Sequence, residues 1–137
     1  MKIVDIQCFP LRTNLSRAIG FSQWYYHAKN NFVLKVVCDD GTVGWGECYG
    51  PNLAIAASVE HHFKPLLIGK DPLQNKVLWN FMWRAYCDFN RHGIFIAAIS
   101  GIDIALWDIK GKALDAPVRV LLGGSSEPVP CYATGMY

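Results

Sequence analysis

The sequence has little charge and no charge runs. Only 18% of its 137 residues are Asp, Glu, Lys or Arg, and the formal net charge is +2. We therefore expect no extended electrostatic surface for nucleic acid or anionic lipid, and neither as a partner. With 52% hydrophobic residues, the chain is too apolar for a disordered tail and suits one compact domain.

Cysteine patterns typical of metal sites and disulfide scaffolds are also missing. The five cysteines form an odd set, with no CxxC pair and no zinc-like spacing to the four histidines. We expect free thiols in a reducing, cytoplasmic compartment. No window approaches the roughly 18 apolar residues of a membrane span, so no membrane partner is expected. Asp5 near the N-terminus, without a long apolar core, predicts that no signal peptide is present.

No catalytic constellation is recognisable in the sequence. It contains no paired carboxylates at metal spacing, no nucleophile with a base that can be placed beside it, and no phosphate-binding glycine loop. Gly44 and Gly46 lie within a predicted strand and indicate close packing only. We predict no catalytic and no metal-ligating residue within this chain.

Apolar and polar residues alternate in the first third of the chain. Every second residue is apolar over part of the segment from Lys2 to Arg12, which is typical of a half-buried strand. Further strands are predicted at Phe32–Cys38 and Val43–Cys48, joined by turn residues at 39–42. Strands joined by so short a turn are antiparallel, so the sequence predicts a three-stranded antiparallel meander.

A spacing of three to four residues between apolar positions predicts a helical set after the meander, and hence an α+β fold. The first helix occupies residues 50–69, the second follows Asp71, and the third runs from about Gly93 to Leu114. The Asp71 side chain is expected to cap the second helix. The second helix is expected to bury four apolar residues: Leu73, Val77, Phe81 and Ala85.

The third predicted helix carries a stripe of small residues that ends in a charge pair. At 100° per residue, Ala97, Gly101 and Ala105 align with Asp108 and Lys112. Small residues allow a neighbouring backbone to approach closely. The pair is predicted to lie at a packed boundary, where pairing fixes the register. The alternative is a solvated pair on an exposed edge, because most charges stay outside.

Between the first two predicted strands, residues 21–31 read FSQWYYHAKNN. The segment lacks apolar–polar alternation, which indicates a loop. Loops normally avoid large rings unless the rings pack beneath the loop or close over something.

The segment 98–112 resembles the signature of the mandelate racemase and muconate lactonising enzyme group of the enolase superfamily. The match includes an Ala-x-Ser-Gly start, Asp103, an Ala-Leu-x-Asp step ending at Asp108, and Gly-Lys ending at Lys112, followed by Pro-Val and Leu-Leu-Gly. These three charged residues are interpreted as structural signature residues. The preceding strands and connections resemble the same group in the same order, so the resemblance covers essentially the whole chain.

This resemblance implies an N-terminal capping domain, which in the family packs over a modified TIM barrel. Residues 1–123 would form the capping domain, and 124–137 a linker with only the start of the first barrel strand, the barrel itself being absent. The family abstracts a proton next to a carboxylate and uses magnesium, held by carboxylates on barrel strands. Mg2+ is therefore implied for the full-length parent, and the 137-residue chain alone is expected to bind no cofactor and to be inactive.

In the family, the loops after the first and third strands form a lid over the substrate. The resemblance implies that Trp24, Tyr25, Tyr26, His27, Lys29 and Tyr49 are lid residues. The rings could instead pack against the helices of the same domain or against a neighbouring subunit. Expected partners are a small carboxylic acid substrate, the missing barrel and further copies in a homo-oligomer.

A polar and aromatic lid favours a hydroxylated acid, so dehydration of an acid sugar is the leading prediction. Racemisation or epimerisation of a 2-hydroxy acid is the first alternative. A non-catalytic, free-standing cap module for association or ligand binding is the second.

Overall fold

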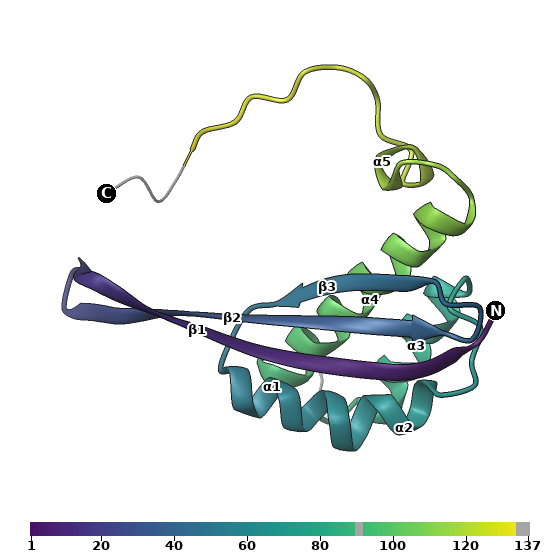
Figure 1. Ribbon diagram of the computed structural model, residues 1–137, viewed down its shortest axis with the longest axis horizontal. Coiled ribbons are helices and arrows are strands. Elements are labelled where there is room, and N and C mark those ends of the chain that lie inside the picture. Colours follow the sequence, from purple (N-terminus) through teal and green to yellow (C-terminus); the bar gives the residue numbers. More distant parts are fainter. Residues whose placement is uncertain (90–91, 134–137) are drawn as a thin grey trace.

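The computed structural model describes residues 1–89 and 92–133. Three antiparallel strands form one sheet in the order β1-β2-β3, with β1 at Ile3–Phe21, β2 at Trp24–Cys38 and β3 at Val43–Cys48. Helices cover one face of this sheet (Figure 1). The predicted α+β class and the antiparallel meander are both confirmed.

The helices begin with a continuous run that contains a π-helical turn. Their bounds are Asn52–Ser58 for α1, Val59–Phe63 for the π-helix η1, Lys64–Leu67 for α2, Asn75–Ala85 for α3, Ile94–Ala113 for α4 and Val118–Leu121 for α5. The first three replace the single helix predicted at 50–69. Pro65 explains the π turn, since proline has no N–H and its ring clashes with the carbonyl four residues earlier. The short helix α5 was not predicted.

The core lies between the sheet and the helices. Its largest fully buried side chains include Phe32 and Leu34 from β2, Phe63 from η1, and Ile102 and Leu106 from α4. Helix α4 runs along the sheet with the bounds expected from its periodicity. Eight of its residues are buried, most of them in the core.

Strand β3 and helix α4 approach each other backbone to backbone. A Cβ atom added at Gly46 would lie 1.9 Å from the carbonyl oxygen of Gly101, and one at Gly44 would lie 2.1 Å from that of Ala105. The small residues predicted along the third helix therefore meet two glycines of β3. No larger side chain fits at this contact without moving a backbone.

Asp108 and Lys112 join the end of this contact to the outer edge of β3. The Asp108 carboxylate accepts hydrogen bonds from the Trp45 backbone N–H at 2.9 Å and from Lys112 Nζ at 2.7 Å. Lys112 Nζ also donates to the Val43 carbonyl at 2.8 Å. Both side chains are partly exposed. The pair thus lies on an exposed edge, as the solvated alternative held. It still holds the strand in register against the helix, as the packed-boundary alternative required.

Replacing Asp108 by alanine is expected to lower the free energy of unfolding by about 1 to 2 kcal/mol, because two hydrogen bonds to the carboxylate are lost. Asp108→Asn is the matched control, since its amide oxygen can still accept the bond from Trp45, and we expect a smaller loss. Urea unfolding of the three chains measures both effects. Equal stability of the alanine variant and the parent would show that the pair contributes nothing.

The prediction for the second helix was wrong by one position. α3 buries Asn75, Leu78 and Met82, whereas Val77 and Phe81 are exposed. Three apolar stripes compete on this helix at i,i+4 spacing, so periodicity alone could not choose between them. The capping role of Asp71 was also misplaced. Its carboxylate accepts from the Leu73 N–H at 3.0 Å, which closes a turn before the helix begins.

An ion pair between Asp5 and Lys64 fastens β1 to α2. This pair and a hydrogen bond from Gln7 hold the pKa of the Asp5 carboxyl below its ordinary value of 3.8. A depressed folded-state pKa contributes stability that is present above the ordinary value and lost as the pH falls through the folded one. We expect the Asp5→Asn variant to lose less unfolding free energy than the parent as the pH falls below 3.8. Unfolding curves recorded against pH, with Glu127→Gln as control, test this; parallel curves would contradict it.

After α5, residues 124–133 form no helix or strand. The start of a barrel strand was expected here, and it is not formed over these residues, because a strand needs a neighbour for its hydrogen bonds. The rest of that prediction, at 134–137, lies outside the described residues. Within the described ranges, no helix is both long and apolar enough to cross a membrane.

Candidate functional site

Strands β1 and β2 continue beyond β3 as a two-stranded ribbon. β3 pairs with β2 only as far as Phe32, whereas β1 and β2 stay paired up to Phe21 and Trp24. We call residues 13–30 the hairpin arm. The arm projects from the body of the domain (Figure 1). The loop predicted at 21–31 is therefore wrong, since most of this segment is strand.

The arm lacks apolar–polar alternation because it has no continuous buried face. Trp24 is 71% exposed, Tyr25 67% and Tyr26 46%. Alternation marks a strand only where one side of the sheet is buried. The rings thus lie on a ribbon held by backbone hydrogen bonds rather than by a core.

The base of the arm is anchored by asparagines. Asn52, the first residue of α1, donates from Nδ2 to the Leu11 carbonyl at 3.0 Å and to the Asn31 carbonyl at 3.1 Å. Asn31 Nδ2 donates in turn to Glu47 Oε1 at 3.0 Å. All three strands and helix α1 are therefore tied together where the arm leaves the sheet.

A large bulge interrupts β1 within the arm. Asn14 pairs with Ala28 and Ile19 pairs with Tyr26, so the residues between Asn14 and Ile19 face His27 alone. Bulges bend a strand, re-aim its side chains and are common beside active sites.

The bulge borders a hollow of about 730 Å³, here called the bulge hollow. It is lined by Leu15, Ser16, Arg17, Ala18, Ile19, Gly20, Tyr26 and Lys29. Arg17 and Lys29 supply cations, while Ser16 and Tyr26 supply hydroxyl groups. No carboxylate lines it, so the bulge hollow suits an anionic, hydroxylated ligand.

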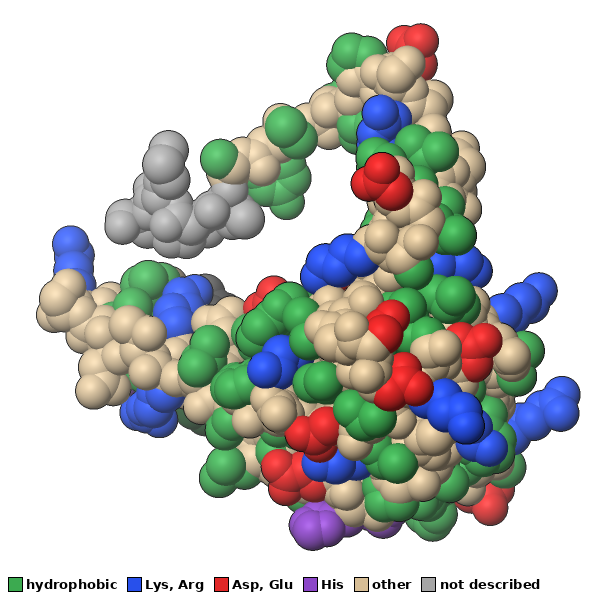
Figure 2. Space-filling model, turned by 45° about the vertical axis from the view of Figure 1, so that its right-hand side comes forward, with side chains coloured by type: hydrophobic (Ala, Val, Ile, Leu, Met, Phe, Trp, Pro, Cys, Tyr) green, Lys and Arg blue, Asp and Glu red, His purple; other side chains and the backbone are tan. Residues whose placement is uncertain are grey.

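The wider charge pattern of the arm agrees with this chemistry. From Ile6 to Cys38 the sequence contains no aspartate or glutamate, but it contains four cationic residues, Arg12, Arg17, Lys29 and Lys35. Lys and Arg side chains are visible along the arm in Figure 2, whereas acidic side chains are spread over the body of the domain.

The structure brings only two of the six predicted lid residues to the bulge hollow, namely Tyr26 and Lys29. Trp24 and His27 belong to the arm but do not line the bulge hollow. Tyr25 packs locally: a Cβ atom added at Gly20 would lie 2.6 Å from Cε1 of the Tyr25 ring. Tyr49 follows β3 and is 95% exposed.

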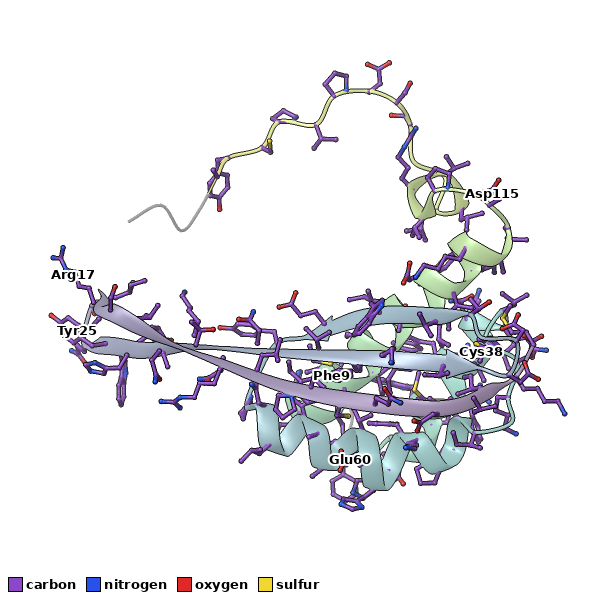
Figure 3. All side chains as sticks on the ribbon, in the orientation of Figure 1. Phe9, Arg17, Tyr25, Cys38, Glu60 and Asp115 are labelled. Atoms are coloured by element: carbon purple, nitrogen blue, oxygen red, sulfur yellow. The ribbon has the colours of Figure 1, made fainter. Side chains whose placement is uncertain are left out.

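Arg17 is the residue that the sequence interpretation missed. Its side chain extends from the end of the arm toward the side on which residues 124–133 pass (Figure 3). The signal that could have found it is the absence of acids around it, since an unneutralised arginine on an acid-free hairpin indicates an anionic partner.

Asp103 lies on α4, away from the residues that line the bulge hollow. Burial raises the pKa of its carboxyl, and a hydrogen bond from Trp107 partly offsets this. Lys110 Nζ lies 5.2 Å from the centroid of the Trp107 ring and donates to the Leu73 carbonyl at 3.3 Å. The bond to Leu73 joins α4 to the segment before α3.

A divalent metal does not fit the residues present. Within residues 1–89 and 92–133, no three His, Cys, Asp or Glu side chains come close enough together to hold a metal ion. These described residues therefore supply no site for a metal-dependent step.

Known proteins are similar to this chain over nearly its whole length. Residues 6–123 match the family described as mandelate racemase / muconate lactonizing enzyme, N-terminal domain. D-galactarolactone cycloisomerase of Agrobacterium fabrum is 41% identical over 138 residues, which cover 100% of this chain and 36% of that protein. Arabinonate dehydratase of Saccharolobus solfataricus is 42% identical over 113 residues, covering 81% and 30%.

A solved structure shows the same likeness in three dimensions. The crystal structure of 3,6-anhydro-D-galactonate cycloisomerase from Zobellia galactanivorans has a TM-score of 0.82 and 41% sequence identity, and the match covers 93% of this chain and 33% of that one. The chain thus spans about a third of the length of these relatives. It belongs to the mandelate racemase / muconate lactonizing enzyme group of the enolase superfamily, as a member of its N-terminal domain family.

Proposed function

We propose that this chain is the capping domain of a magnesium-dependent enzyme that dehydrates an acid sugar. Residues 1–123 form the cap, and 124–137 lead into a barrel outside this chain. Arabinonate dehydratase, at 42% identity, supports the reaction class. Its coverage of only 30% by this chain supports a barrel that lies elsewhere.

The observation that carries the proposal is the bulge hollow on the arm. Cations and hydroxyl groups line a hollow on a ribbon that has no core of its own, which suits a lid that acquires its packing when substrate binds. In this proposal Tyr26 and Lys29 contact the part of the substrate remote from the reacting carbon. Trp24, Tyr25, His27 and Tyr49 surround that contact and exclude water.

Magnesium, which the family resemblance implies, would be held by residues outside this chain. The part played by the chain is to orient the substrate and enclose it. We further propose a cytoplasmic location, since all five cysteines are unpaired with one another and reduced thiols are typical of that compartment. A homo-oligomer is proposed from the family resemblance.

Isomerisation is the second candidate, because the Agrobacterium and Zobellia relatives are both named cycloisomerases. The two reactions differ in their products. Dehydration releases one water and leaves a 2-oxo-3-deoxy acid, whereas isomerisation conserves the mass of the substrate.

The test is a panel of sugar acids and their lactones incubated with the full-length protein and magnesium, with products followed by mass spectrometry. We expect loss of one water from at least one sugar acid, and no turnover by the 137-residue chain alone. Products of unchanged mass would favour isomerisation. A complete lack of turnover across the panel would contradict the proposal and favour a binding module.

A further inference from the structure

We propose that the bulge hollow binds a second carboxylate of the substrate, so that the enzyme prefers dicarboxylic sugar acids over monocarboxylic ones. This inference rests on the proposed function and specifies the substrate class for the same site. One carboxylate would lie at the reacting end of the substrate, and the other would reach the arm.

The charges of the bulge hollow carry the inference. Arg17 comes from β1 and Lys29 from β2, so cations face the hollow from both strands. A guanidinium group binds a carboxylate with two parallel hydrogen bonds, which fixes both position and orientation. A monocarboxylic sugar acid ends in a neutral CH2OH group, which would leave two cations without an anionic partner when the lid excludes water.

No described aspartate or glutamate neutralises these cations. Among residues 1–89 and 92–133, neither Arg17 nor Lys29 forms an ion pair with an aspartate or glutamate. Lys64 and Lys112, by contrast, do form ion pairs, and their carboxylate partners lie on the body of the domain. The two arm cations therefore remain available for a ligand.

The bulge gives Arg17 its position. A regular ribbon would place one residue opposite His27, but the residues between Asn14 and Ile19 occupy that place. Arg17 lies within this insertion and points toward the side on which residues 124–133 pass (Figure 3). Without the bulge, neither the hollow nor this direction of Arg17 would exist.

Steady-state kinetics of the full-length protein test the inference with a matched pair of substrates. Galactarate and D-galactonate share their hydroxyl configuration and differ only in whether the far end is a carboxylate or CH2OH. We expect Arg17→Met to lower kcat/KM for galactarate by about 10- to 100-fold, mainly through KM. For D-galactonate the change should stay within about 2-fold, because a neutral end loses no charge-assisted bond.

Arg12→Met is the matched control, since Arg12 lies on the same strand just before the arm and does not line the bulge hollow. It should leave kcat/KM for both substrates unchanged. Calorimetric titration of galactarate and D-galactonate, with magnesium present, reports binding without turnover. In this titration too, we expect Arg17→Met to weaken the binding of galactarate but not that of D-galactonate.

Equal losses for both substrates, or no loss for galactarate, would overturn the inference. If D-galactonate is turned over and Arg17→Met changes nothing, the proposed function stands and the inference fails. If galactarate binds through Arg17 but no sugar acid is turned over, the inference stands and the proposed reaction fails. If the protein neither binds nor turns over either acid, both fail.

Discussion

Gly46→Ala is expected to destabilise the domain by about 3 kcal/mol or more, the largest effect of any single substitution considered for this fold. The added Cβ would lie 1.9 Å from the Gly101 carbonyl oxygen, and neither backbone can move without separating β3 from α4. Urea unfolding of the variant and the parent chain measures the loss. A variant within about 1 kcal/mol of the parent would contradict the close contact.

Gly20→Ala is the matched control for that substitution. Its added Cβ would meet the Tyr25 ring at 2.6 Å, which is also too close for an ordinary contact. The obstacle is the end of a side chain that is 67% exposed and able to rotate away. We therefore expect a loss below about 1 kcal/mol. The contrast separates a clash with backbone from a clash with a movable ring.

Shortening the arm is expected to abolish most activity while leaving the domain folded. Replacing residues 15–27 by Asn-Gly would join Asn14 directly to Ala28, which already pair with each other, through a two-residue turn of a favoured type. Among the residues of the deleted segment whose burial the structure describes, none belongs to the buried core, so the free energy of unfolding should change by less than about 1 kcal/mol.

The full-length enzyme with the shortened arm should lose about 100-fold or more in kcat/KM toward its sugar acid, because substrate is neither oriented nor shielded from water. Steady-state kinetics measure this, and circular dichroism with a melting curve checks that the fold survives. Activity within about 3-fold of the parent would show that the arm is not a lid. Loss of the folded state would show that the arm is structural.

Much of the fold could be predicted because burial leaves a period in the sequence. β2 from Phe32 onward and helix α4 both have a face in the core, and their patterns located them correctly. The arm could not be recognised as strand, because most of its described side chains are exposed and Ala28 alone among them is buried, so no apolar–polar alternation results. On α3, adjacent stripes ending in Phe81, Met82 and Trp83 were equally apolar, and only packing selected Met82.

The candidate site was predictable only in part. Tyr26 and Lys29 were among the predicted lid residues because rings and a lysine are unusual between two strands. Arg17 was missed because its position depends on the bulge, and a bulge is a mismatch of register between two strands that neither strand shows alone. Tyr25 was included on composition, although its ring covers Gly20 of the same hairpin.

Hydrogen exchange along the arm tests the central claim most directly. The amides of residues 14–29 would be followed in the full-length protein, with magnesium present, before and after addition of a sugar acid that binds. If the arm is a lid, exchange should slow there by about 10-fold or more on binding, while exchange in α4 changes little. Unchanged exchange in the arm, with ligand bound, would contradict the account.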